Sequence, residues 1–206
     1  RAEELKKKFP LVHLSSTISL DEGHVISQTF PRDNDEKIFV INQLKLEISL
    51  SNIFLKYMFD KLESDTKFNT NCFLKHFKEW GLCSDKNFTF LKKGLMHYYN
   101  GDNISAITIL VLQFEDILRN LLEAAGQPAT NPNYGAIILR PLLNNSVFKA
   151  AAGLDLTRYY EVMLIEKTGF NLRNKVAHGL MDPKEMDKNM ALRVIHLLLT
   201  LTRFIP

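Results

Sequence analysis

The chain has 206 residues, of which 46% are hydrophobic and 24% charged, and its formal net charge is +3. This composition is typical of a soluble globular protein, and it supplies enough apolar side chains for a core without disulfides or metals. A net charge this small does not indicate nucleic-acid binding unless basic residues are concentrated in one region.

Cysteine usage and hydropathy favour an intracellular protein. Cys72 and Cys83 have no cysteine or histidine near them at the spacing of a zinc site, so we expect reduced thiols. No uninterrupted apolar run approaches the ~20 residues that span a bilayer. No signal peptide is visible, although a chain that begins at Arg1 rather than methionine is typical of an excised piece and would hide one. We therefore expect a cytoplasmic protein with no membrane partner.

The first 36 residues are expected to form an irregular arm with one short helix over residues 2–9, because prolines, a glycine and a charged run interrupt them. From there on helical periodicity dominates, since apolar residues recur at spacings of three and four. Helices are predicted at residues 37–64, 70–80, 85–99, 102–125, 137–143, 146–152 and 154–167, and after Pro183 as far as residue 203.

Capping residues support these boundaries. Asp102 or Asn103 can accept hydrogen bonds from the first-turn amides of the helix at 102–125, and Gly126 followed by Pro128 ends it. Asp102 is better explained as this cap than as a catalytic carboxylate. The predicted fold class is all-α, a helical bundle with an irregular N-terminal extension.

Arg173 and His178 are the strongest candidates for chemistry, in the segment Asn-Leu-Arg-Asn-Lys-Val-Ala-His-Gly at 171–179. Arginine presents a planar fork of donors that matches a phosphate, and histidine exchanges protons near neutral pH. Asn174 adds an amide donor and acceptor. The combination suits phosphodiester transfer.

Their spacing alone favours a plainer interpretation. Residues five apart on an ideal helix are separated by about 140° around its axis, so Arg173 and His178 do not stack on one face. They can line one cleft if both lie near irregular helix ends, or a second copy can complete the site across a twofold axis. Without further signal, the arginine would pair with a carboxylate and the histidine would cap a helix C-terminus.

The wider string closely resembles the R-N-x-x-x-H signature of the HEPN superfamily (higher eukaryote and prokaryote nucleotide-binding domains). More specifically, L-R-N-x-x-A-H-G-L resembles a largely uncharacterised, mainly bacterial subfamily, in which it follows a helix of the type Y-x-x-G-D-x-x-x-A-x-x-x-L-x-x-Q-x-E-x-x-x-R. The resemblance covers residues 85–206 well and the first 84 residues less well. The upstream pattern is matched at Tyr98, Gly101, Asp102, Ala106, Leu110, Gln113, Glu115 and Arg119.

The resemblance implies an HEPN-like helical domain at residues 85–206, with 1–84 as an N-terminal extension and packing helices. Many members of the superfamily are metal-independent ribonucleases that act as dimers. By this resemblance, Arg173 would stabilise charge on the scissile phosphate, and His178 would deprotonate a ribose 2′-hydroxyl to give a 2′,3′-cyclic phosphate. Asn174 would orient one of them or the RNA.

No cofactor or metal is expected, because the remaining histidines lack ligand spacing with a carboxylate or with each other. These histidines are His13, His24, His76, His97 and His196.

Further residues are assigned supporting roles. Glu115 and Arg119 form an i, i+4 pair of opposite charge, read as fold support or as support of the Arg173/His178 site. Basic residues are candidates for contacts with RNA phosphates, and three aromatic residues that flank the motif are candidates for base stacking, although core packing is favoured for them. The basic candidates are Arg140, Lys149, Arg158 and Lys175, and the aromatic ones are Tyr159, Tyr160 and Phe170.

Three functions are therefore considered. The leading hypothesis is an HEPN-type endoribonuclease that acts on RNA as a homodimer, and family association suggests a toxin or antiviral effector with an antitoxin or regulatory domain as partner. The second is a non-catalytic module that binds nucleotides or serves for dimerisation in a larger protein. The third is a structural domain that packs on the remainder of a longer chain.

Overall fold

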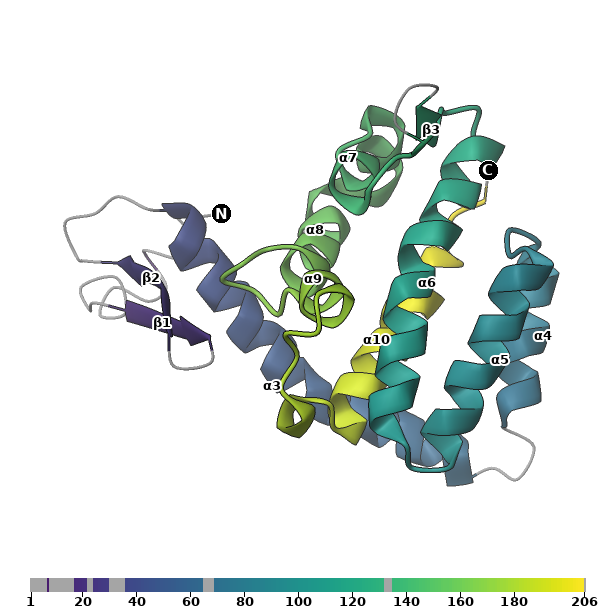
Figure 1. Ribbon diagram of the computed structural model, residues 1–206, viewed down its shortest axis with the longest axis horizontal. Helices are drawn as coiled ribbons and strands as arrows, with labels where there is room; N and C mark the ends of the chain where they lie inside the picture. The colour runs from purple at the N-terminus through teal and green to yellow at the C-terminus, as the bar shows by residue number, and fades with distance from the viewer. Residues whose placement is uncertain are drawn as a thin grey trace.

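The computed structural model describes residues 7, 17–21, 24–29, 36–64, 69–131 and 135–205, with side chains from residue 38 onwards and at Lys7. Within these ranges the chain forms eight α-helices, and the predicted all-α fold class is confirmed (Figure 1). The elements are β1 (Thr17–Asp21), β2 (His24–Thr29), α3 (Glu36–Ser64), α4 (Thr70–Trp80), α5 (Asp85–Tyr99), α6 (Asn103–Ala124), β3 (Thr130–Asn131), β4 (Gly135–Ala136), α7 (Leu139–Leu143), α8 (Ser146–Leu164), α9 (Leu172–Ala177), a 3-10 turn at Pro183–Glu185 and α10 (Lys188–Leu201).

Side-chain caps fix where several helices begin. Asn69 accepts a hydrogen bond from the Asn71 amide at the start of α4, and Asp102 accepts one from Ser105 at the start of α6. At α5 the cap is reciprocal: Ser84 accepts from the Asn87 amide, and the Asn87 side chain accepts from the Ser84 amide. These contacts satisfy amides that have no partner within the helix, so the predicted starts of α4, α5 and α6 are accurate to one residue. The start of the last helix was predicted too early, because a 3-10 turn follows Pro183 and α10 begins only at Lys188, where Asp187 caps it.

The N-terminal arm differs from its prediction. β1 and β2 pair antiparallel, where the sequence was expected to be irregular. The alternation Thr-Ile-Ser-Leu, followed by Asp-Glu-Gly and the β-branched pair Val25–Ile26, is a weak hairpin signal that helical periodicity elsewhere obscured. The predicted helix at residues 2–9 lies outside the described residues except for Lys7, which is helical.

α6 is the central helix of the bundle. It contacts α5, α7, α9 and α10, and Ala106, Ile107, Leu110, Ile117 and Leu118 on it are completely buried. Figure 1 shows α5 and α4 on one side of α6 and the α7–α9 segment on the other. A Cβ at Gly94 of α5 would collide with the Leu110 side chain, which shows how closely α5 and α6 approach.

The longest helix, α3, is joined to this core along one face. Ile41, Leu44, Asn52 and Phe59 are buried, and the Phe59 ring stacks on Phe73 of α4 with centroids 6.2 Å apart. Phe59, Phe73 and Phe77 belong to the same apolar cluster as the α6 side chains, so the core takes side chains from both sides of residue 84.

One segment of α3, Ile38–Ser64, is long and apolar enough to cross a membrane by length and composition, with a mean hydropathy of 1.3. The sequence analysis expected no such segment because it searched for uninterrupted apolar runs. In α3 a few charged residues interrupt the run, but they are spread over 27 residues and the mean hydropathy stays high. Only 17% of its most apolar window is buried, although one face of α3 packs against α8 and α10.

Candidate functional site

The motif helix α9 begins after a tight turn at Gly169. The Gly169 amide donates to the Glu166 carbonyl at 2.9 Å, and the Phe170 amide donates to the Val162 carbonyl at 2.8 Å. A Cβ at position 169 would collide with the Val162 carbonyl oxygen, so this turn requires glycine. Leu172 is completely buried and anchors the first turn of α9 in the core. The predicted break at residues 168–169 therefore places α9 against the body of the molecule.

Asn171 starts α9 in the left-handed conformation, with φ 53° and ψ 30°. Asparagine tolerates this conformation better than most residues because its short side chain can bond locally. The side-chain Nδ2 of Asn174 donates a hydrogen bond to the side-chain Oδ1 of Asn171 at 2.8 Å. The side-chain nitrogen of the candidate catalytic residue Asn174 therefore holds the entry to α9, while its side-chain Oδ1 accepts no hydrogen bond from the described residues.

His178 lies at the other end of α9, where a glycine-dependent cap stops the helix. The Leu180 amide donates to the Lys175 carbonyl at 2.7 Å and the Gly179 amide to the Val176 carbonyl at 3.3 Å. Gly179 has φ 69°, which completes a Schellman motif. His178 is exposed, and its imidazole has no hydrogen bond or ion pair with any described residue. Its ring nitrogens are available to solvent and to a substrate.

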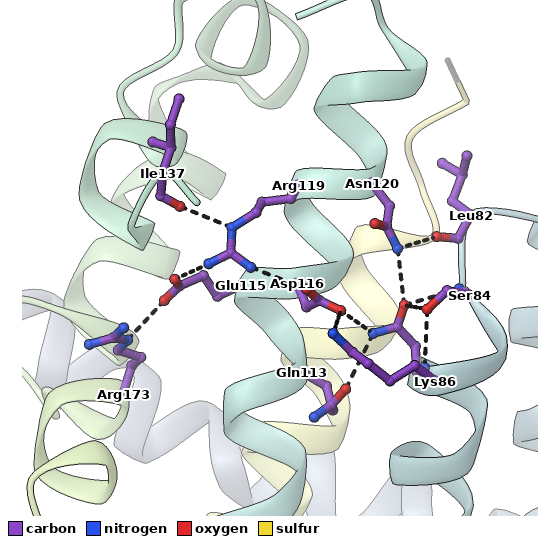
Figure 2. A network of polar contacts seen from close by, with 11 residues as sticks. Leu82, Ser84, Lys86, Gln113, Glu115, Asp116, Arg119, Asn120, Ile137 and Arg173 are labelled. Carbon is purple, nitrogen blue, oxygen red and sulfur yellow. Dashed lines mark hydrogen bonds and ion pairs between the residues drawn. The ribbon is translucent and has the colours of Figure 1, made fainter. Parts of the chain in front are cut away.

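Arg173 points away from its own helix to α6. Its Nε donates to Oε2 of Glu115 at 2.9 Å, and the other oxygen of Glu115 pairs with Nη2 of Arg119 (Figure 2). The Glu115 side chain is only 9% exposed, so this carboxylate lies between two guanidinium groups in a largely dehydrated place. The predicted i, i+4 pair is present, and Glu115 also contacts Arg173 directly.

The two terminal nitrogens of Arg173 make no hydrogen bond to any described residue, and its side chain is 24% exposed. Because Nε is held by Glu115, the guanidinium plane is fixed while its outer edge stays open. That edge carries the parallel donors with which arginine binds phosphate or carboxylate oxygens.

The network of ion pairs formed by Arg173, Glu115 and Arg119 extends to α5 through Asp116, a residue that the sequence analysis did not single out. We call this network, from Lys86 to Arg173, the relay. Asp116 accepts from Arg119 Nη1 at 3.2 Å on one oxygen, and from Asn87 Nδ2 at 2.8 Å and Lys86 Nζ at 3.0 Å on the other. Figure 2 shows this relay running from the start of α5 across α6 to Arg173. Asp116 precedes Arg119 by three residues, which places them as neighbours on one helix face and was the available signal.

Electrostatics keep Asp116 ionised. Burial alone would raise the pKa of this carboxyl, but hydrogen bonds from Lys86 and Asn87 and the charges of Lys86 and Arg119 outweigh it. The net effect lowers the pKa of Asp116 below its usual value. Basic and acidic side chains alternate along this network, from Lys86 through Asp116, Arg119 and Glu115 to Arg173.

Arg173 and His178 are not in contact within the described part of one chain. The first lies in the opening turn of α9 and bonds to α6, whereas the second caps the far end and faces solvent. A phosphodiester substrate that reaches both groups must bridge the ends of this short helix, or a second copy must bring its own Arg173 and His178 to the same cleft.

The basic residues proposed to bind RNA lie in different places. Lys149 and Arg158 of α8 line one shallow groove of about 300 Å³. Lys149 Nζ donates to Asn144 at 2.6 Å, and Arg158 pairs with Glu161 at 3.3 Å.

Arg140 and Lys175 are committed elsewhere. Arg140 pairs with Glu166 at 3.5 Å and donates to the Ile165 carbonyl, with half of its side chain exposed. The Lys175 side chain is only 11% exposed and lies 3.5 Å from Glu185. Lys175 lines a separate pocket of about 280 Å³ beside the motif, together with Lys45, Phe170 and Arg193. The four candidates do not share a single groove.

The aromatic candidates mostly serve the core, as favoured. Tyr160 is completely buried, its ring 4.9 Å from that of Phe114, so it cannot stack on a base. Tyr159 is partly buried, with its hydroxyl 2.9 Å from Nδ1 of His196. Phe170 is also partly buried and lies under two cations, Lys45 and Arg193.

Asp102 is a helix cap, as expected. One of its oxygens accepts from the Ser105 amide at 3.0 Å, and the other lies 3.0 Å from Nδ1 of His97. Hydrogen bonds from Ser105 lower the pKa of Asp102, with a further contribution from His97. Among the described residues, no group of three or more histidines, cysteines, aspartates or glutamates is arranged to hold a metal ion.

A scan of protein-family models, a search of curated proteins and a search of solved structures each found no match to this chain.

Proposed function

We propose that this protein is an endoribonuclease of the HEPN type, in which Arg173 and His178 of two copies form a shared site. The observation that carries the proposal is the state of these two side chains. Nε of Arg173 is held by Glu115, while neither terminal nitrogen of Arg173 nor the imidazole of His178, at the other end of the same short helix, bonds to any residue that the structure describes. Both features suit phosphodiester transfer, and both residues lie in the motif that resembles the family signature.

In this mechanism His178 accepts the proton of a ribose 2′-hydroxyl, and the 2′-oxygen attacks the adjacent phosphorus. The bond from phosphorus to the 5′-oxygen breaks, and the leaving oxygen takes a proton from the second copy's His178. The products are a 2′,3′-cyclic phosphate and a 5′-hydroxyl. The terminal nitrogens of Arg173 stabilise the charge that develops on the phosphate oxygens. Lys149 and Arg158 can contact the RNA backbone beyond the site.

We expect the purified chain to cleave RNA in excess EDTA. His178→Ala should lower the rate by at least about 100-fold, the usual contribution of a general acid–base group, and Arg173→Ala should do the same. His97→Ala is the matched control, because His97 is a partly exposed histidine bound to the cap residue Asp102 and away from the motif. Circular dichroism and thermal melting establish that each variant is folded. His178→Ala is the more secure test, since His178 is exposed and makes no hydrogen bond, ion pair or ring contact with the described residues.

One observation favours the non-catalytic alternative: Arg173 has a structural partner in Glu115, and an arginine that holds α9 to α6 needs no catalytic role. Titration with ATP and RNA oligonucleotides distinguishes the two. Tight binding of either ligand without turnover, unchanged in His178→Ala, would refute the ribonuclease and support a binding module.

A further inference from the structure

Side chains of α3, α8 and α10 line a groove of about 590 Å³, which is larger than the groove along α8 and the pocket beside the motif. We call it the α3–α10 groove. Its volume falls in the range of sites that hold small organic molecules. The walls are apolar, with Ile48 and Leu55 on α3 and Leu156 on α8. No residue of the motif helix α9 lines this groove, so it is distinct from the candidate site around Arg173 and His178.

The face of α10 that lines the α3–α10 groove is polar. Arg193, His196 and Thr200 follow one another at intervals of three and four residues, which places them in one row along the helix. Arg193 and Thr200 are about 10 Å apart along the axis at 1.5 Å per residue. A mostly apolar lining with a few polar groups that fix orientation is the usual composition of a ligand site.

Arg193 is the group in this row that is best placed to hold an anion. Its Nε donates to Oδ1 of the buried Asn52 at 3.2 Å, and its guanidinium lies over the Phe170 ring at 4.9 Å. Neither terminal nitrogen bonds to any residue that the structure describes. Burial lowers the pKa of Arg193 more than the charge of Asp187 raises it. An anion at the open edge of this guanidinium would therefore offset hydration that is lost on folding.

The charges around the α3–α10 groove favour a ligand with a single negative charge. Two arginines and two acidic residues line it, so it has no excess of positive charge for a phosphate dianion or for RNA. They are Arg193, Arg203, Glu47 and Asp155. Burial lowers the pKa of His196, which is therefore neutral at pH 7. A carboxylate matches the two parallel terminal nitrogens of one guanidinium, and the apolar walls accommodate a hydrocarbon body.

We propose that the α3–α10 groove binds an aliphatic carboxylate. The carboxylate lies on the terminal nitrogens of Arg193, and the alkyl chain runs along α10 toward Thr200, between the walls formed by α3 and α8. This proposal goes beyond RNA cleavage and does not depend on it. Its readout is ligand binding by the whole chain, so it can fail while the ribonuclease proposal holds, and the reverse.

Calorimetric titration with hexanoate, octanoate and decanoate tests the apolar walls. We expect one molecule bound per chain, with an affinity that rises by up to roughly fourfold for each added methylene group. No binding of decanoate, or an affinity that is independent of chain length, would overturn the proposal. Several molecules bound per chain would also overturn it, because that result indicates adsorption to the exposed apolar side chains of α3.

The carboxylate contact is tested by comparison with 1-decanol, which has the same chain without the charge. The unmodified protein should bind decanoate at least about tenfold more tightly than 1-decanol, because hydrogen bonds to a charged group are the stronger ones. Arg193→Gln should abolish this preference, whatever the substitution does to the affinity for both ligands together. The matched control is Arg203→Gln, at the other end of the row, which should retain the preference. A preference that persists in Arg193→Gln contradicts the proposed contact.

A third variant tests the position of the ligand without altering a charge. Ser51 is an exposed residue of α3 that lines the α3–α10 groove, so Ser51→Trp should fill the groove and prevent decanoate binding. Ser49→Trp is the matched control, because Ser49 is an exposed serine of the same helix outside the lining. Circular dichroism establishes that both variants are folded. Decanoate that binds equally to both would place its site elsewhere and overturn the proposal.

Discussion

Glu115 is the residue on which the orientation of Arg173 depends. Its carboxylate accepts from Arg173 on one oxygen and from Arg119 on the other, and its side chain is almost fully buried. Removal of one partner from such a group leaves a charge without compensation in a poorly hydrated place. This contact therefore contributes to stability and positions a side chain of the candidate site.

Glu115→Gln should lower the free energy of unfolding by about 2–3 kcal/mol, because a charged acceptor of two arginine hydrogen bonds is replaced by a neutral amide. Urea denaturation at neutral pH measures this loss. In the same variant we expect slower RNA cleavage, since Arg173 is no longer held in one plane. Glu123→Gln is the matched control: Glu123 is an exposed glutamate on the same helix and should change stability by less than about 0.5 kcal/mol. Equal stability of the two variants would contradict the role given to Glu115.

The sequence indicated Arg173 and His178 as candidates through the resemblance of the local string, and the pair Glu115 and Arg119 through helical spacing. It was not sufficient for the contacts of Asp116 with α5. Asn87 lies 29 residues away, and only the packing of α5 on α6 brings its amide to the Asp116 carboxylate. The dispersal of the four basic residues had the same cause, since their separation depends on how α7, α8 and α9 fold over one another.

At the scale of elements, α8 is two helices joined by a kink. Gly153 has φ 71° and ψ 172°, a conformation that only glycine adopts readily, and it lies where the sequence predicted a break between 146–152 and 154–167. The helix changes direction at the kink. Leu154, just after it, is exposed, whereas Tyr160 and Leu164 further along the same helix are buried in the core.

Gly153→Ala should destabilise the protein by about 1–3 kcal/mol, the usual cost of a strained backbone conformation. The sign of the change is the test, because alanine in a regular helix would stabilise by up to about 1 kcal/mol relative to glycine. A Cβ at this position meets no atom within 4 Å, so any loss comes from backbone strain rather than from a clash. Chemical denaturation settles the sign, and a gain in stability would contradict the observed kink.

Helix positions followed well from periodicity and caps, whereas the hairpin of β1 and β2 did not. A helix can be recognised from apolar residues that recur three and four positions apart, so the pattern that predicts it lies within a short stretch of sequence. Two short strands depend on their pairing, and a short hairpin is only marginally stable in isolation.

At the scale of the whole molecule, α3 is both part of the core and a free surface. Its buried face joins the cluster around α6 through Phe59, and its other face exposes large apolar side chains such as Ile53, Phe54 and Tyr57. The sequence showed an amphipathic period but could not show that both faces are apolar and only one is covered, because coverage depends on where α8 and α10 pack.

Phe59→Ala should cost about 3–5 kcal/mol, as for other large core aromatics, if α3 is integral to the single core. Phe90→Ala in α5, at a site 42% exposed, is the matched control and should cost about 1 kcal/mol. Thermal unfolding should stay a single transition in both variants. A separate early transition in Phe59→Ala would show that α3 unfolds on its own and would contradict a shared core.

The relay that ends at Arg173 also determines whether the side-chain entropy of Arg173 is lost on folding or on ligand binding. A free arginine side chain gives up close to 2 kcal/mol of rotamer entropy when it is immobilised. Here much of that loss accompanies folding, because Lys86, Asp116, Arg119 and Glu115 restrain the guanidinium before any ligand arrives. An anion that meets the open edge of Arg173 then binds a preorganised group, and more of the contact energy remains as affinity.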